Sequence, residues 1–155
     1  MKRIQLVAFL FCSFLLLQSC NKEKRYSTKL MKGETWSVEH IKINGVEFDY
    51  TGKWYIESDV DIYDSVPTLE WKVDGLDAFF EWQFQDKGKT LQLNYNQLCS
   101  EADGTLIDTL DYTGHDISGA YNVERHGRNK MEFTSSVTIG HPNKLVEISI
   151  ERVKN

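Results

Sequence analysis

Apolar and polar residues alternate along most of this 155-residue chain, and this period of two is the feature that most constrains its fold. Phe80, Trp82 and Phe84 occupy alternate positions in one run, and Met131 and Phe133 do so in a later run. Successive side chains of a β-strand point to opposite faces, so each run predicts a strand with one buried face. Apolar residues rarely recur at the three- and four-residue spacing of a helix, which favours an all-β chain.

Turn signals separate these runs. Asn44-Gly45 is the strongest, because both residues accept the positive φ angles of a two-residue hairpin. Asp74-Gly75, Asp86-Lys87-Gly88-Lys89 and His126-Gly127-Arg128-Asn129 are further turns. Short strands with a turn every 8–12 residues or so indicate a sandwich or a barrel. Hairpin-length connections favour an antiparallel up-and-down meander, and closing the meander into a barrel removes its exposed edges.

Three local details refine this prediction. The alternation shifts by one residue at His40, between Val38 and Ile41, as it does at a β-bulge. Leu106 to Tyr112 is expected to be another strand. Ile117, Gly119, Tyr121 and Val123 are expected to line one face of the strand that follows.

Several segments resemble bacterial lipocalin-like lipoprotein domains. Leu30 to Val38, with Gly33 and Trp36, followed by Asn44-Gly45, looks like the first strand and turn of that family. The segments 118–123, 130–133 and 144–153 resemble its late hairpin and final strand. The usual Gly-x-Trp spacing of the family is Gly33-x-x-Trp36 here, and Gly52-Lys53-Trp54 has the commoner spacing. The resemblance spans most of residues 30–153 and implies a lipocalin-like barrel of about eight strands.

The N-terminus has the pattern of a secretory signal. Lys2 and Arg3 precede an apolar run from Ile4 to Leu17, which is shorter than the roughly 20 apolar residues of a membrane span. The run ends in Leu17-Gln18-Ser19-Cys20, which resembles the lipobox of bacterial lipoproteins. That resemblance implies cleavage before Cys20 and acylation of this cysteine. A retained anchor and a signal cut without lipidation are the alternatives.

The predicted organisation has three parts: a signal peptide over 1–19, a flexible tether over 20–29 and a barrel domain over 30–155. The tether is highly charged and has one aromatic residue and no period. Asn21 after the cysteine resembles the sorting signal of lipoproteins that are delivered to the outer membrane. This resemblance implies a domain on the periplasmic face or at the cell surface. Removing Lys2 and Arg3 makes the mature chain more acidic than the formal −5 of the whole sequence, which disfavours nucleic acid as a partner.

No residue pattern predicts catalysis, a cofactor or a metal site. Cys12 leaves with the signal, so Cys99 is a lone thiol that is expected to pack as a small apolar residue. The stretch 59–64 has alternating aspartates but lacks the glycine and terminal glutamate of an EF-hand, so a solvated strand face is expected. The histidines lack zinc-ligand spacing, and Gly-x-Ser-x-Gly and phosphate-binding glycine loops are absent.

The aromatic residues on the expected inner faces lead to two hypotheses. In the first, the barrel holds a small apolar ligand, lined by Trp36, Trp71, Trp82, Phe84 and Tyr121. In the second, the barrel is filled by its own side chains and the lipoprotein contacts another envelope protein or a glycan. An eight-stranded barrel has room only for its own side chains or one small ligand, so large inward aromatics favour packing. An enzyme is a third and weaker alternative.

Overall fold

The computed structural model describes residues 22–48, 50–57, 66–96 and 109–154. Nine strands, a short 3-10 turn (η1) and two α-helices make up this part of the chain, and the first helix spans residues 22–31. The remaining elements are β1 (Thr35–Ile43), β2 (Val46–Glu47), β3 (Lys53–Ile56), β4 (Thr68–Val73), β5 (Leu76–Gln85), η1 (Asp86–Gly88), β6 (Thr90–Tyr95), α3 (Thr109–Ile117), β7 (Gly119–His126), β8 (Lys130–Val137) and β9 (Pro142–Arg152).

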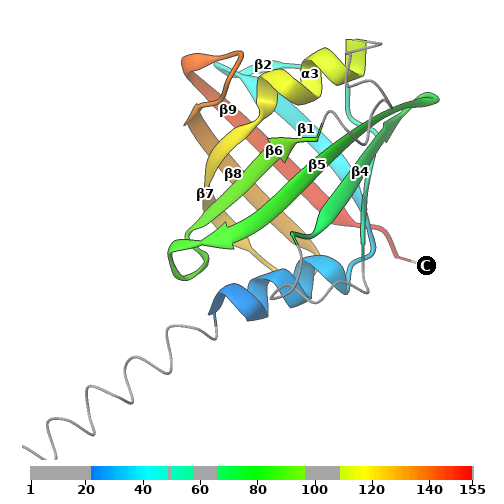
Figure 1. Ribbon diagram of the computed structural model, residues 1–155, viewed down its shortest axis with the longest axis vertical. Helices are drawn as coiled ribbons and strands as arrows, with labels where there is room; N and C mark the ends of the chain where they lie inside the picture. The colour runs from blue at the N-terminus through cyan, green and yellow to red at the C-terminus, as the bar shows by residue number, and fades with distance from the viewer. Residues whose placement is uncertain (1–21, 49, 58–65, 97–108, 155) are drawn as a thin grey trace, which may run out of the picture.

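Eight of the strands form a closed antiparallel barrel. From β3 to β9 each strand pairs with the next along the chain, β1 pairs with β3, and β9 pairs back onto β1 to close the ring. The two-residue β2 is an extra strand that continues the β1 hairpin. Figure 1 shows the meander winding once around the barrel. The predicted fold class, an antiparallel up-and-down meander closing into a barrel of about eight strands, is therefore confirmed.

Local sequence signals fix the shape of β1. The pairing of β1 with β9 shifts between Val38 and His40, so that Val38 and Ile41 both point inward, as the predicted bulge requires. At the end of β1, Asn44 and Gly45 adopt φ angles of 51° and 78°, the backbone of a two-residue hairpin turn. Both features follow from residues that are neighbours in the sequence.

The core fills the inside of the ring. Buried and partly exposed residues alternate along β4, β5 and β8, so one face of each strand is turned inward and the other faces solvent. The largest side chains with less than 2% exposed surface are Trp36, Trp54, Trp71, Trp82, Tyr121, Phe80 and Phe133. The interior is therefore built mainly from aromatic rings.

One predicted strand is wrong. Residues 109–112 belong to the helix α3, and residues 106–108 lie outside the described residues. Leu110, Thr113, Gly114 and Ile117 are buried at the spacing of a helix face, because this segment packs across one end of the barrel. Ile117 consequently ends a helix and does not share a strand face with Tyr121.

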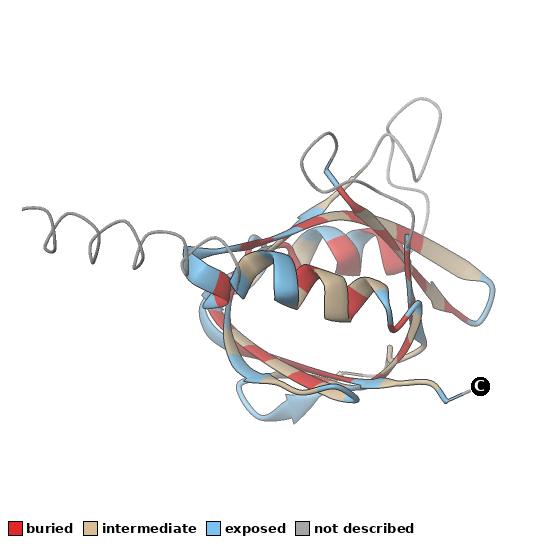
Figure 2. Ribbon diagram, turned by 90° about the horizontal axis from the view of Figure 1, so that it is seen from below, coloured by how far each residue is buried: buried red, intermediate tan, exposed pale blue. Residues whose placement is uncertain are grey.

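Most of the segment over 20–29, which was predicted to be a flexible tether, is helical. Residues 22–31 are helical, and Ser27 and Leu30 are buried against the opposite end of the barrel (Figures 1 and 2). The many charged residues of this segment made its short buried face difficult to recognise. A helix of this length becomes stable only because the barrel supplies a surface for that face. Cys20, Cys99 and the stretch 59–64 lie outside the described residues.

Candidate functional site

The five residues predicted to line a ligand chamber all lie in the packed interior. Trp36, Trp71 and Tyr121 have no exposed surface, while Trp82 retains 1% and Phe84 retains 3%. They come from β1, β4, β5 and β7, so the closed ring brings them into one core. Their burial follows from strand alternation, and it gives each of them a packing role.

The polar atoms of these aromatic residues are bonded to backbone and do not point at an open space. Each of the three indole N–H groups, and the phenol O–H, donates a hydrogen bond to a carbonyl oxygen. The bonds join Trp36 to Leu30 at 2.9 Å, Trp71 to Thr51 at 2.6 Å, Trp82 to Thr68 at 3.2 Å and Tyr121 to Ile117 at 2.5 Å. Burial without charged neighbours also raises the pKa of the Tyr121 phenol far above its ordinary value. These groups hold the aromatic rings in place.

Trp54 is a core residue that the sequence analysis did not single out. It stands opposite Trp36 on one side and opposite Trp71 on the other, so three indoles form a row across β1, β3 and β4. The small Ala78 follows in the same row, opposite Trp71 on β5. Along the sequence Trp54 and Ile56 alternate with Lys53 and Tyr55, and this period of two could have identified Trp54 as an inward-facing residue.

Many side chains of the described interior have no accessible surface. A side chain beside a chamber wide enough for water would retain accessible surface toward that chamber. Trp36, Phe80, Leu91, Met131 and Ile150 line different strands around the ring, and each has 0% exposed surface. None of these five side chains borders a space wide enough for water, and close packing of this kind is normal for a protein core.

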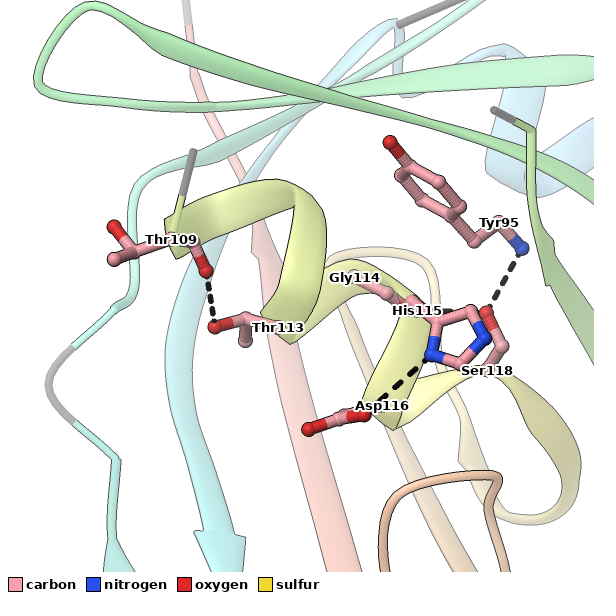
Figure 3. A network of polar contacts seen from close by, with 7 residues as sticks. All are labelled: Tyr95, Thr109, Thr113, Gly114, His115, Asp116 and Ser118. Carbon is pink, nitrogen blue, oxygen red and sulfur yellow. Dashed lines mark hydrogen bonds and ion pairs between the residues drawn. The ribbon is translucent and has the colours of Figure 1, made fainter. Parts of the chain in front are cut away.

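The helix α3 covers one end of the barrel, which we call the distal end (Figure 1). Gly114 allows the close approach, because a Cβ at this position would lie 3.1 Å from the Tyr95 ring and 3.2 Å from that of Phe80. Ser118 locks the helix to β6: its hydroxyl donates to the Gly114 carbonyl at 3.0 Å and accepts the Tyr95 N–H at 2.8 Å. Figure 3 shows this network, in which Nδ1 of His115 lies 3.5 Å from the Asp116 carboxylate. The contacts are those of a structural cap.

The helix over residues 22–31 covers the other end, which we call the basal end (Figure 2). The Tyr26 ring stacks on the His126 ring with centroids 3.6 Å apart and planes 9° apart, and it meets the edge of Phe84 at 5.8 Å. Leu30 is fully buried, and its carbonyl accepts the Trp36 indole N–H. The helix is therefore part of the folded domain.

The turn between β5 and β6 is shaped to receive this helix. The Glu23 carboxylate accepts a hydrogen bond from the backbone N–H of Lys87 at 2.6 Å. Gly88 has a φ of +79° and lies directly under Tyr26, where a Cβ would come within 2.5 Å of the ring. Only glycine suits both the backbone conformation and the space at this position.

His126 lies partly buried beneath the first helix. Burial, followed by the nearby charges of Lys29 and Arg25, lowers its pKa from 6.5 to about 4, so the ring is neutral at pH 7. The Lys29 ammonium lies 3.5 Å from Nδ1, and Nε2 is buried with no hydrogen-bond partner in the described structure. Two residues of the first helix contact this ring, because Tyr26 stacks on it and Lys29 lies beside Nδ1. His126 therefore serves as a docking surface for the helix.

A pocket of about 390 Å³ opens at the basal end. It is lined by Gly33, Glu34, Arg128, Asn129, Arg152, Val153 and Lys154. Three of these side chains are cationic and one is acidic, so the pocket favours an anion. Sequence analysis missed it because its residues come from the start of β1, the β7–β8 turn and the end of β9.

The described residues contain no group of three or more His, Cys, Asp or Glu side chains that could hold a metal ion. Within the same residues, no helix is long and apolar enough to span a membrane. Comparison of the chain with models of protein families, with curated proteins and with solved structures found no match.

Proposed function

We propose that this chain is a lipid-anchored envelope lipoprotein whose filled barrel is a non-catalytic interaction module. The observation that carries the proposal is that interior side chains on different strands of the described ring, such as Trp54, Phe80 and Met131, have no exposed surface. Helices cover both ends of the same barrel (Figures 1 and 2). A ligand inside would have to displace aromatic rings, so these features favour an outer surface as the site of function.

The anchor is proposed from the sequence Leu17-Gln18-Ser19-Cys20. The first helix begins at residue 22, so an acylated Cys20 would hold the basal end of the barrel within a few residues of the bilayer. Acyl chains contribute about 0.8 kcal/mol per buried methylene, and more than one chain gives stable anchoring. We place the protein at the outer membrane, on the periplasmic face or at the cell surface.

The partner is proposed to be an envelope protein that contacts the distal end. Large apolar side chains are exposed there, and we call them the distal apolar patch: Val46, Tyr112, Val137, Ile139 and Leu145, with exposures from 45% to 72%. Backbone bonds tie these segments together, because Asn44 bonds Leu145 and Ile139 donates to the Ser118 carbonyl beside α3. Exposed apolar side chains gathered at one end of a molecule are typical of a protein contact site, and this end would point away from a basal anchor.

Site-specific photocrosslinking in intact cells tests the interaction. A photoreactive residue at Ile139, in the distal apolar patch, should trap one defined envelope protein. A matched probe at Gln83, exposed on the side of the barrel, should not trap it. Recovery of uncrosslinked monomer alone from Ile139, or of crosslinks to a second copy of this chain, would contradict the proposal.

The anchor has its own test. Cys20→Ser protein should leave the membrane fraction after a high-salt wash, whereas wild-type protein should remain. A Cys20→Ser protein that stays in the washed membranes would show that something other than an acyl chain holds it.

A further inference from the structure

The helix over residues 22–31 has a second face that is mostly exposed, and only Lys29 on this face also contacts the barrel, at His126. Glu23, Tyr26, Ser27 and Leu30 follow helical spacing on the inner side, where Tyr26, Ser27 and Leu30 pack against the barrel and Glu23 bonds its turn. On the outer side Lys22, Arg25 and Lys29, followed by Lys32, recur at intervals of three, four and three residues. Such spacing places these four residues on one face, and we call them the basal basic stripe.

No acidic side chain among the described residues forms an ion pair with the basal basic stripe. Glu23, the only acid on this helix, is turned toward the barrel, where it accepts the Lys87 N–H. Lys22, Arg25 and Lys32 are exposed, while Lys29 leans over the Tyr26 ring at 5.9 Å. The stripe therefore presents its positive charge to whatever faces the basal end.

The rest of the basal end adds positive charge next to the stripe. The pocket described above contributes the cations Arg128, Arg152 and Lys154 against one acid, Glu34, so its lining remains net positive. Arg152 donates a hydrogen bond to the Lys32 carbonyl at 2.7 Å, which joins the pocket to the end of the stripe. The whole sequence carries a formal charge of −5, so a cationic basal end makes the protein electrically asymmetric.

We propose that the basal end is a docking surface for the anionic headgroups of a lipid bilayer. The apolar face of the first helix is already buried against the barrel, so the contact is electrostatic and the helix does not insert. The basal basic stripe faces the lipid phosphates, and the pocket is large enough to admit a headgroup. This inference deepens the proposed function, on which it rests, because a basal anchor and a basal docking surface together hold the distal apolar patch away from the membrane.

The experiment uses the chain from Cys20 to Asn155 with Cys20→Ser, which has no acyl group and retains every described residue. The protein is sedimented with phosphatidylcholine vesicles that either contain or lack phosphatidylglycerol. We expect binding to the anionic vesicles at low salt, loss of binding at high salt, and no binding to phosphatidylcholine alone. Equal binding to both vesicles, or none to the anionic ones, would overturn the proposal.

Charge variants locate the surface. Each Lys or Arg held against an anionic leaflet strengthens binding about five-fold, so the triple change Lys22→Gln, Arg25→Gln and Lys32→Gln should weaken it about 100-fold. The control triple, Lys42→Gln, Lys53→Gln and Lys144→Gln, removes the same charge away from the basal end and should change binding less than about two-fold. Equal losses in the two triples would contradict basal docking. Near-ultraviolet circular dichroism verifies that both variants are folded.

Two further comparisons distinguish a failure of the docking surface from a failure of the lipid anchor. Calorimetric titration with inorganic phosphate tests the pocket against a free anion, and saturable phosphate binding without vesicle binding would overturn the lipid proposal. If the lipidated protein stays in washed membranes while the unlipidated chain ignores anionic vesicles, the docking surface fails and the anchor stands. If the unlipidated chain binds but Cys20→Ser has no effect in cells, the anchor fails.

Discussion

Replacing Tyr26 with Ala tests whether the first helix belongs to the folded domain. Tyr26 is partly buried, stacks on His126 at 3.6 Å and meets the edge of Phe84 at 5.8 Å. Aromatic contacts contribute about 0.5 to 1.5 kcal/mol each, so losing two of them should lower the free energy of unfolding by about 1 to 3 kcal/mol. For a domain of this size that corresponds to a Tm lower by roughly 4 to 12 °C.

The assay is urea denaturation at constant pH, followed by tryptophan fluorescence, on the chain from Cys20 to Asn155 with Cys20→Ser. Arg25→Ala is the matched control, because Arg25 neighbours Tyr26 but is exposed on the outer face of the helix. The control should change the free energy of unfolding by no more than about 0.5 kcal/mol. If Tyr26→Ala is as neutral as the control, residues 22–29 are the flexible tether that their composition suggested, and the docked helix is wrong.

Three further changes probe the two ends and the interior. His126 has a folded-state pKa of about 4 against 6.5 when unfolded, so its neutral ring stabilises the protein above pH 6.5 and that stability is lost as pH falls toward 4. The loss in the free energy of unfolding should be about 1 to 2 kcal/mol after discounting for the partial exposure of the ring. His126→Gln should flatten the dependence of the free energy of unfolding on pH. An unchanged pH dependence in this variant would contradict the role of His126. Ala78→Leu should lower the free energy of unfolding by about 1 to 3 kcal/mol in denaturation, because no room remains beside Trp71, whereas a hollow barrel would accept it. Gly88→Ala should cost at least about 1 kcal/mol by the same measurement, because its φ is +79° and its Cβ would meet Tyr26; a neutral result would contradict the tight turn.

The barrel itself was predictable because its signals are local. Alternation fixes which side of each strand faces inward, and Asn44-Gly45 encodes its own turn. The shift at His40 even located the bulge in β1. These features depend on neighbouring residues, so a single sequence is enough to recognise them.

The two caps were not predictable in the same way. The helix α3 contains Gly114, a poor helix former, and the first helix is short and highly charged. Both are stabilised by surfaces that exist only after the barrel closes. How tightly the interior packs also depends on which side chains become neighbours on adjacent strands, such as Trp36, Trp54 and Trp71.

The basal end escaped prediction for a further reason. Its residues are distant in sequence: Tyr26 meets His126, and Arg152 bonds Lys32. The spacing of the basic residues from Lys22 to Lys32 was visible in the sequence, but it becomes informative only once that segment is a helix.

Native mass spectrometry of the full-length protein, purified from cell membranes and released gently from detergent, tests the central claim most directly. We expect a mature chain that begins at Cys20 and carries covalently attached acyl groups, with no bound small molecule. A stoichiometric non-covalent ligand, released as the collision energy rises, would contradict the filled barrel, and a mass without acyl groups would contradict the anchor.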